Sequence, residues 1–187
     1  MTVFELISLG FYNLKLINVI ENFITEVFQS EVIILPQTQV PSDYKNIYRG
    51  QYDGFKLLRW SSNLKRLESS ILVGLADVDA YVLGLNFIFG IADPKSRVAL
   101  VFLERLKEAE GLQGVKFITR VKKEVLHEVG HVLGLRHCSN KKCVMVFSNS
   151  IYDTDFKEFK YCGSCYGFLI HSGFSVNPKY SLGEVIS

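Results

Sequence analysis

The sequence has few cysteines, little excess charge and no long apolar run. Its 187 residues include four cysteines, four prolines and four histidines. A chain of this length buries roughly 70% of the surface of its unfolded state, so it needs no disulfide bonds to hold a core. The 21 basic and 19 acidic residues leave a net charge of +2. This balance argues against a protein that binds nucleic acid mainly through bulk charge.

The sequence also lacks the patterns of a membrane or exported protein. The longest stretch without Asp, Glu, Lys or Arg runs from Tyr161 to Pro178, and its three glycines and Asn177 do not suit a lipid-facing helix. The N-terminal residues contain Glu5 and no basic cluster, so we expect no secretory signal. We therefore expect a cytoplasmic protein with no membrane partner, whose cysteines are not interpreted first as disulfides.

The apolar residues change between strand-like and helix-like spacing along the chain. Five segments have the apolar pattern of strands: Thr2–Leu9, Val32–Leu35, Ile71–Val78, Gly84–Ala92 and Arg97–Leu103. Three segments have the spacing of amphipathic helices: Phe11–Gln29, Gly54–Glu68 and Val115–Leu133. This order predicts an α/β fold, of mixed α+β character, in which helices pack on a mixed, twisted sheet of about five strands.

The composition changes after Gly134, where the chain becomes rich in Cys, Gly and Ser. We expect one domain over residues 1–177. Residues 1–134 form its sheet-and-helix part and include the helix discussed next, and residues 135–177 form a C-terminal part that the cysteines stabilise. The last ten residues, 178–187, are predicted to be a loose tail.

One segment, from His127 to His137, carries the residues of a metal site. On a helix, His127 and His131 lie on one face about 6 Å apart along the axis, so they can bind one metal ion together. Glu128 lies beside them, close enough to act on a metal-bound water without being a ligand. Gly134 can end the helix with a positive φ, and the chain can then bring back His137 as a third ligand. Three neutral imidazoles and one water form the open tetrahedral site of a catalytic zinc ion.

All four cysteines form a second pattern, with Cys138 and Cys143 in one pair and Cys162 and Cys165 in the other. Two close pairs separated by a loop are typical of a closed, structural zinc site with four thiolate ligands, to which we assign no chemistry. The alternatives are free thiols, or two disulfides if the protein is exported. Cys138 directly follows His137, so we expect the structural zinc to hold the loop that carries the third histidine.

These residues resemble the long zinc motif of the metzincin metallopeptidases, with Met145, eight residues after His137, in the position of their Met-turn. The four cysteines resemble those of the archaemetzincins in particular, because Cys138 immediately follows the third histidine and a Cys-x-Met sequence ends at Met145. This specific resemblance covers Lys122–Cys165. The preceding two thirds of the chain are compatible in their order of elements but carry no further motif.

The resemblance implies a compact metzincin-like domain, with the mixed sheet above a cleft and the zinc-binding helix as the cleft floor. It implies that Met145 lies beneath the metal as a hydrophobic base and is not a ligand. It also implies that an edge strand lines the cleft and pairs with an extended substrate, for which the alternative is a plain core strand. The candidate for this strand is the segment Asn86, Phe87, Ile88, Phe89, Gly90, Ile91 and Ala92.

The motif and the resemblance together lead us to expect a zinc metallopeptidase that binds two zinc ions per chain, one catalytic and one structural. Zinc lowers the pKa of a bound water to about 7 and polarises the scissile carbonyl. Glu128 would accept the proton of the attacking water and deliver it to the leaving amine. We expect a peptide or protein substrate and a monomeric chain.

Two other classes of function fit parts of the sequence. The first is a non-catalytic, zinc-stabilised binding module with a vestigial histidine site, against which Glu128 argues because a purely structural three-histidine site needs no general base. The second is a four-cysteine domain that binds nucleic acid. Lys141 and Lys142 lie in the cysteine loop, between Cys138 and Cys143, but two lysines at a net charge of +2 give only weak support for nucleic-acid binding.

Overall fold

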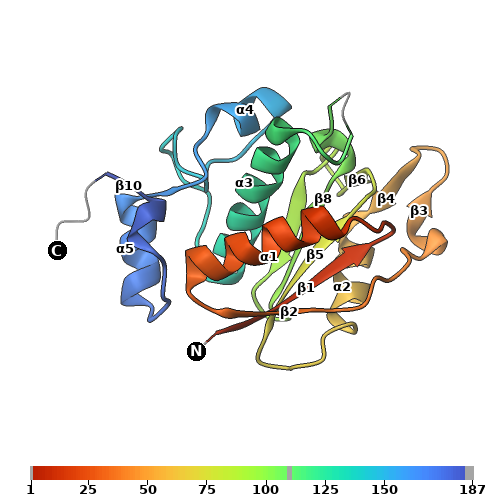
Figure 1. Ribbon diagram of the computed structural model, residues 1–187. Helices are drawn as coiled ribbons and strands as arrows, with labels where there is room; N and C mark the ends of the chain where they lie inside the picture. Colours follow the sequence, from red (N-terminus) through yellow and green to blue (C-terminus); the bar gives the residue numbers. More distant parts are fainter. Residues whose placement is uncertain (1, 109–110, 184–187) are drawn as a thin grey trace.

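A five-stranded mixed sheet organises the N-terminal part of the molecule (Figure 1). The structure is a computed structural model that describes residues 2–108 and 111–183. The strands lie in the order β2-β1-β5-β8-β7, in which the first four are parallel and β7 is antiparallel to β8. Their bounds are β1 Val3–Leu9, β2 Glu31–Ile34, β5 Ile71–Ala76, β7 Gly90–Asp93 and β8 Val98–Phe102. The predicted mixed sheet of about five strands is confirmed.

Helices cover both faces of this sheet. Successive side chains of a strand point to opposite faces, so Phe4 and Leu6 of β1 join one core cluster while Ile7 and Leu9 join another. The first cluster lies beneath α1 and α3, and the second lies beneath α2, which is behind the sheet in Figure 1. The bounds of these helices are α1 Leu14–Phe28, α2 Gly54–Ser62 and α3 Val115–Val132. Helix α3, which carries the histidine motif, packs on β8 and on the edge strand β7.

The helix predicted over residues 54–68 ends earlier, at Ser62. The buried carboxylate of Glu5 in β1 accepts the backbone N–H groups of Arg66 and Leu67, each at 3.1 Å. In a longer helix these N–H groups would donate to helical carbonyl groups instead. A side chain from a distant strand therefore decides where the helical segment ends.

The strand predicted over residues 84–92 is also shorter, because only Gly90–Asp93 joins the sheet. Up to Ile88 the chain makes contacts outside this sheet: the N–H of Ile88 donates to the carbonyl of Ala80 at 2.9 Å, and the carbonyl oxygen of Asn86 accepts the side chains of Arg49 and Gln51, each at 2.9 Å. Gln51 belongs to a small second sheet that the sequence analysis missed, because its strands are two or three residues long. They are β3 Lys45–Asn46, β4 Gln51–Asp53 and β6 Ala80–Tyr81.

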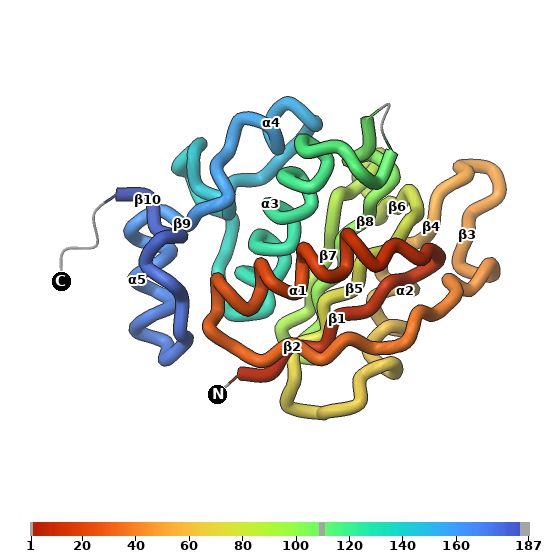
Figure 2. The backbone as a smooth tube through the Cα atoms, in the orientation of Figure 1, coloured from red at the N-terminus to blue at the C-terminus, as the bar shows by residue number. Residues whose placement is uncertain are grey.

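The C-terminal part lies beside α3, at the end of the molecule opposite β3 and β4 (Figures 1 and 2). Its elements are α4 Ile151–Phe156, β9 Tyr161–Cys162, α5 Gly163–His171, the 3₁₀ helix η3 Pro178–Tyr180 and β10 Ser181–Leu182. Two further 3₁₀ turns in the N-terminal part are η1 Ser42–Tyr44 and η2 Glu104–Leu106. Within the described part of the chain, no helix is both long and apolar enough to cross a membrane.

The segment predicted to be a loose tail is ordered over its first residues. Strand β10 pairs with β9 in parallel, and the buried ring of Tyr180 packs edge-on against Phe23 of α1, with ring centroids 5.6 Å apart. The N–H of Asn177 donates to the carbonyl of Val27 at 2.7 Å. The prediction was wrong here because these contacts join the two ends of the chain, which local sequence does not show. Residues 184–187 of the predicted tail lie outside the described residues.

Candidate metal-dependent active site

Helix α3 carries the first two predicted ligands and ends so that the third can return to them. Gly134 closes the helix with a φ of 97°, a left-handed conformation that favours glycine. The N–H of Gly134 donates to the carbonyl of His131 at 3.0 Å, and that of Leu135 donates to the carbonyl of Gly130 at 2.9 Å. These two bonds turn the chain back and place His137 beside the pair on the helix.

The structure brings the three imidazole rings together. Ligand nitrogens of His127, His131 and His137 lie within 4.8 Å of one another, and the Nε2 atoms of the first two are 3.1 Å apart. His127 is buried, His131 is half-buried and His137 is exposed, so the group opens to solvent on one side. This arrangement is the one that the spacing of the motif predicted.

Hydrogen bonds fix the protonation of the two helical histidines. Nδ1 of His127 lies 2.8 Å from the carbonyl oxygen of Val144, and Nδ1 of His131 lies 2.8 Å from that of Leu135. A carbonyl oxygen only accepts, so each Nδ1 carries the proton and each Nε2 presents a lone pair. Burial lowers the pKa of all three imidazoles, most strongly for His127, which favours their neutral, metal-binding form.

This donor set fits a zinc ion. Two lone pairs that face each other at 3.1 Å repel unless a cation lies near them. Carbonyl groups that hold the Nδ1 protons are the usual support for imidazole ligands of a metal. Three neutral imidazoles with one side open to solvent correspond to the ligands of a catalytic zinc rather than a closed structural one.

The three rings of His127, His131 and His137 together form the imidazole group. Glu128 lies next to this group and is 5% exposed. Burial raises the pKa of its carboxyl group well above the usual range, the nearby carboxylate of Glu124 raises it further, and Lys157 acts in the opposite direction. Gly90 of β7 lies against this carboxylate so closely that a Cβ at Gly90 would collide with the side chain of Glu128. The edge strand therefore approaches the acid only because residue 90 has no side chain.

We expect Gly90→Ala to lower kcat/KM for peptide cleavage by on the order of 10- to 100-fold, because the new methyl group displaces the Glu128 carboxylate. Zinc content should be unchanged, because Gly90 has no side chain that could bind zinc and Glu128 is not a proposed ligand. Gly167→Ala in α5, where a Cβ meets nothing within 4 Å, is the matched control and should keep full activity. A fully active Gly90→Ala enzyme would show that the position of Glu128 tolerates displacement.

Met145 packs beneath the turn of α3 that carries the histidines. It is fully buried, and its Sδ lies against Gly130, where a Cβ would collide with the sulfur. Gly130 lies between His127 and His131 in the chain, so the thioether supports the helix from below. The role of this methionine as the base beneath a metal stays a prediction of the resemblance.

The four cysteines form the second cluster. The Sγ atoms of Cys138, Cys143, Cys162 and Cys165 lie within 4.8 Å of one another, and the structure records all four as free thiols. The pKa of Cys143 is lowered to about 5, because the thiol of Cys165 and backbone N–H groups donate to its sulfur. The same hydrogen bond raises the pKa of Cys165. Four sulfur atoms this close cannot all ionise without a cation, which a zinc ion would supply.

Hydrogen bonds connect the two clusters through one short loop. The N–H of Cys138 donates to the carbonyl of Met145 at 2.9 Å, which closes the loop on itself. The carbonyl of Val144, next to Cys143, is the one that holds the Nδ1 proton of His127. The cysteine loop therefore orients a histidine of the helix, in addition to the adjacent His137.

A cavity of about 230 Å³ connects the imidazole group with the edge strand. Six of the seven residues predicted for the substrate strand line it, namely Phe87, Ile88, Phe89, Gly90, Ile91 and Ala92. The seventh, Asn86, is tied to the small sheet through its carbonyl oxygen. Strand β7 ends the sheet, so one of its sides has no neighbouring strand in the sheet.

Two charged residues of this cavity were missed by the sequence analysis. Glu124 lies one helical turn before Glu128, so the helical spacing could have placed the two carboxylates on one face. Lys157 comes from the loop after α4, and its ammonium lies 3.0 Å from Glu124. No local pattern joins residues so far apart in sequence.

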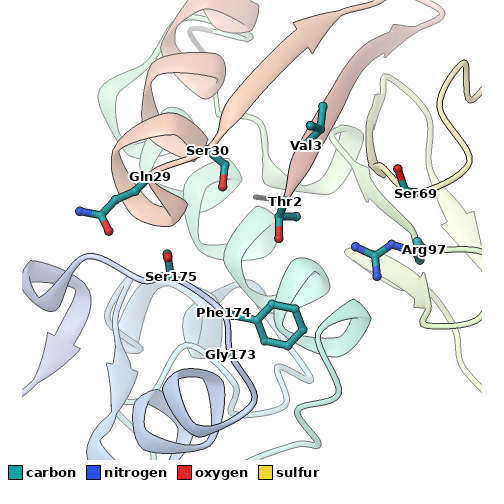
Figure 3. A pocket seen from close by; sticks show the side chains of 9 residues that line it. All are labelled: Thr2, Val3, Gln29, Ser30, Ser69, Arg97, Gly173, Phe174 and Ser175. Atoms are coloured by element: carbon teal, nitrogen blue, oxygen red, sulfur yellow. The ribbon is translucent and has the colours of Figure 1, made fainter.

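A second hollow, of about 540 Å³, lies at the start of β1 and β8 and is shown in Figure 3. Arg97 and the hydroxyl groups of Ser30, Ser69 and Ser175 line it. The described residues around it include no histidine, cysteine or carboxylate. It therefore has no group that could bind zinc or accept a proton from water, and we place the chemistry at the imidazole group.

Comparison with known proteins identifies the family of this chain. The model of peptidase family M54 matches residues 10–170, which is most of the chain. The archaemetzincin of Methanocaldococcus jannaschii is 44% identical over 135 residues, which cover 71% of this chain and 73% of that protein. The family resemblance seen in the sequence is thus confirmed.

Two solved archaemetzincins share the fold. The structure from Archaeoglobus fulgidus, in complex with malonate, has a TM-score of 0.76 and 34% identity, and the match covers 88% of this chain and 99% of that one. The structure from Methanopyrus kandleri has a TM-score of 0.79 and 30% identity, with 91% and 94% covered. On the evidence of family, relatives and fold, this chain belongs to peptidase family M54, the archaemetzincins, and is a zinc metallopeptidase.

Proposed function

We propose that this chain hydrolyses peptide bonds at the imidazole group, with His127, His131 and His137 as zinc ligands and Glu128 as the general base. The observation that supports this most directly is the convergence of neutral imidazole lone pairs beside a buried carboxyl group. A zinc ion held there would polarise the scissile carbonyl and lower the pKa of a bound water. Membership of a peptidase family implies peptide or protein substrates.

The environment of Glu128 suits proton transfer in both directions. Its raised pKa makes it a stronger base than an exposed carboxylate, so it can take a proton from water. The same property lets it release the proton to the leaving amine as the peptide bond breaks. Gly90 keeps the carboxyl group against the edge strand, where a bound peptide would lie.

The edge strand β7 supports an extended mode of substrate binding. Its free side can add a peptide as a further strand, in which backbone hydrogen bonds give affinity and alternate side chains give specificity. The cavity wall beside β7 carries Phe87, Phe89 and Phe147, which suit apolar substrate groups. The protein should therefore cleave unfolded or extended segments in preference to folded ones.

We also propose that the chain binds two zinc ions of unequal affinity, one at the histidines and one at the four cysteines. A weak chelator should remove the histidine-bound zinc first, because thiolates are softer ligands and that site has no open position. Elemental analysis should give two zinc ions per chain before chelation and one after it. Cleavage of a peptide library should stop after the first loss and return when zinc is added. One zinc ion at saturation, or cleavage that survives its loss, would contradict the assignment.

A further inference from the structure

The ammonium group of Lys157 is buried in the active-site cavity. The side chain of Lys157 is 0% exposed, and its Nζ lies 3.0 Å from Oε1 of Glu124, whose side chain is 4% exposed. Both residues line the cavity that contains Glu128 and the imidazole group. Among the described residues, Nζ meets no acceptor with the geometry of a hydrogen bond. The ammonium group of Lys157 therefore has an ion-pair partner, but its N–H groups donate no hydrogen bond to a described residue.

Helix α4, which ends directly before Lys157, is fixed to helix α3 by several hydrogen bonds. Arg120 of α3 binds the carboxylate of Asp155 through two hydrogen bonds, of 2.6 and 2.7 Å. The ammonium group of Lys123 donates to the backbone carbonyl groups of Thr154 and Asp155, each at 2.9 Å. The position of Lys157, two residues after Asp155, is thus built before any ligand arrives.

The stability of the fold does not by itself explain why Lys157 and Glu124 form a buried ion pair. Removing a lysine and a glutamate from water is costly, and their mutual attraction often only offsets that cost. Two apolar residues of similar volume would fill the same space without unused donors. The apolar rings of Phe87, Phe89 and Phe147 line the same cavity as the charged groups, so a buried ammonium with no hydrogen-bond acceptor among the described residues points to a ligand.

We propose that Lys157 binds a carboxylate group of the substrate peptide, which enters the cavity beside Glu128. This inference rests on the proposed function, because it assigns the substrate class of that same cavity. A lysine ammonium has three donors, so Glu124 and a substrate carboxylate can both contact it. A carboxylate carries a full negative charge, so it attracts the ammonium group more strongly than a neutral backbone carbonyl does.

Pairs of peptides that differ by one carboxylate test this proposal. One set carries Glu or Gln at each position in turn, with both ends blocked, and a second set has no acidic side chain and ends in a carboxylate or an amide. We measure kcat/KM on the zinc-loaded wild type and the dissociation constant on zinc-loaded Glu128→Ala. The carboxylate member should be favoured by about 10- to 100-fold, mainly through KM. The set in which this occurs distinguishes a side-chain from a C-terminal carboxylate.

Lys157→Met should reduce this preference to about twofold or less in both measurements. Lys15→Met, at an exposed position of α1, makes the same change of charge and should keep the preference. If the single variant does not fold, Glu124→Gln combined with Lys157→Met removes both charges and gives the same test. Equal kcat/KM and equal affinity within every wild-type pair would overturn the proposal whatever the variants do.

A preference that survives in folded Lys157→Met would also overturn it, because the carboxylate would then bind the metal directly. The same experiments distinguish failure of this assignment from failure of the proposed function. Cleavage without a carboxylate preference would remove only the assignment of Lys157. Carboxylate binding that depends on Lys157 in a protein that cleaves no peptide would remove only the proposed hydrolysis.

Discussion

Glu128→Ala is expected to lower kcat/KM for peptide cleavage by at least about 10²- to 10⁴-fold, which is the usual contribution of a positioned general base. The carboxyl group of Glu128 is buried against Gly90 and lies beside the three histidines, so alanine leaves no acidic side chain at this position. Zinc content and the thermal unfolding temperature should remain near the wild-type values, because Glu128 is not among the proposed ligands. Steady-state kinetics with elemental analysis of the same preparation checks both statements.

Two further variants are compared with Glu128→Ala. Glu31→Ala removes an exposed carboxylate from β2 and should leave kcat/KM unchanged. His131→Ala should also abolish cleavage, but with loss of the zinc ion from the histidine site. If Glu128→Ala kept near-wild-type turnover, its role as general base would be wrong. If it lost zinc as well, the carboxylate would have to be a ligand.

Cys165→Ser is expected to damage both metal sites. A neutral hydroxyl is a far poorer zinc ligand than a thiolate, so the four-cysteine site should lose most of its affinity. Loss of a structural zinc removes at least a few kcal/mol from the free energy of unfolding, so the unfolding temperature should fall by on the order of 10 °C. The affinity of the histidine site for zinc should fall about 10-fold or more, because the cysteine loop supports two of its ligands.

The structure gives the physical route for this coupling. The carbonyl of Val144, beside Cys143, holds the Nδ1 proton of His127, and Cys138 directly follows His137. Ser164→Ala, at the exposed neighbouring position of α5, is the control and should change neither zinc affinity nor unfolding temperature. Titration of zinc into the histidine site of each variant decides the question. Equal affinities in wild type and Cys165→Ser would mean that the two sites are independent.

Local patterns predicted the main elements of the fold, and they failed where distant side chains intervene. The amphipathic spacing of α3 and the apolar runs of β1, β5 and β8 are each fixed by residues close in sequence. The end of α2 depends on Glu5, a residue of β1, and the position of Asn86 before β7 depends on Arg49 and Gln51. Such hydrogen bonds have no periodicity, so a pattern cannot show them.

The sequence by itself determined the family, the helix of His127 and His131, and the candidate base Glu128. It could do so because ligands four residues apart on one helix are brought together by helix geometry alone. Only the tertiary structure decided that Gly90 touches Glu128, that Val144 orients His127, and that Lys157 enters the cavity. Each of these contacts joins different elements, and their distances depend on how helices, loops and sheet pack rather than on any local spacing.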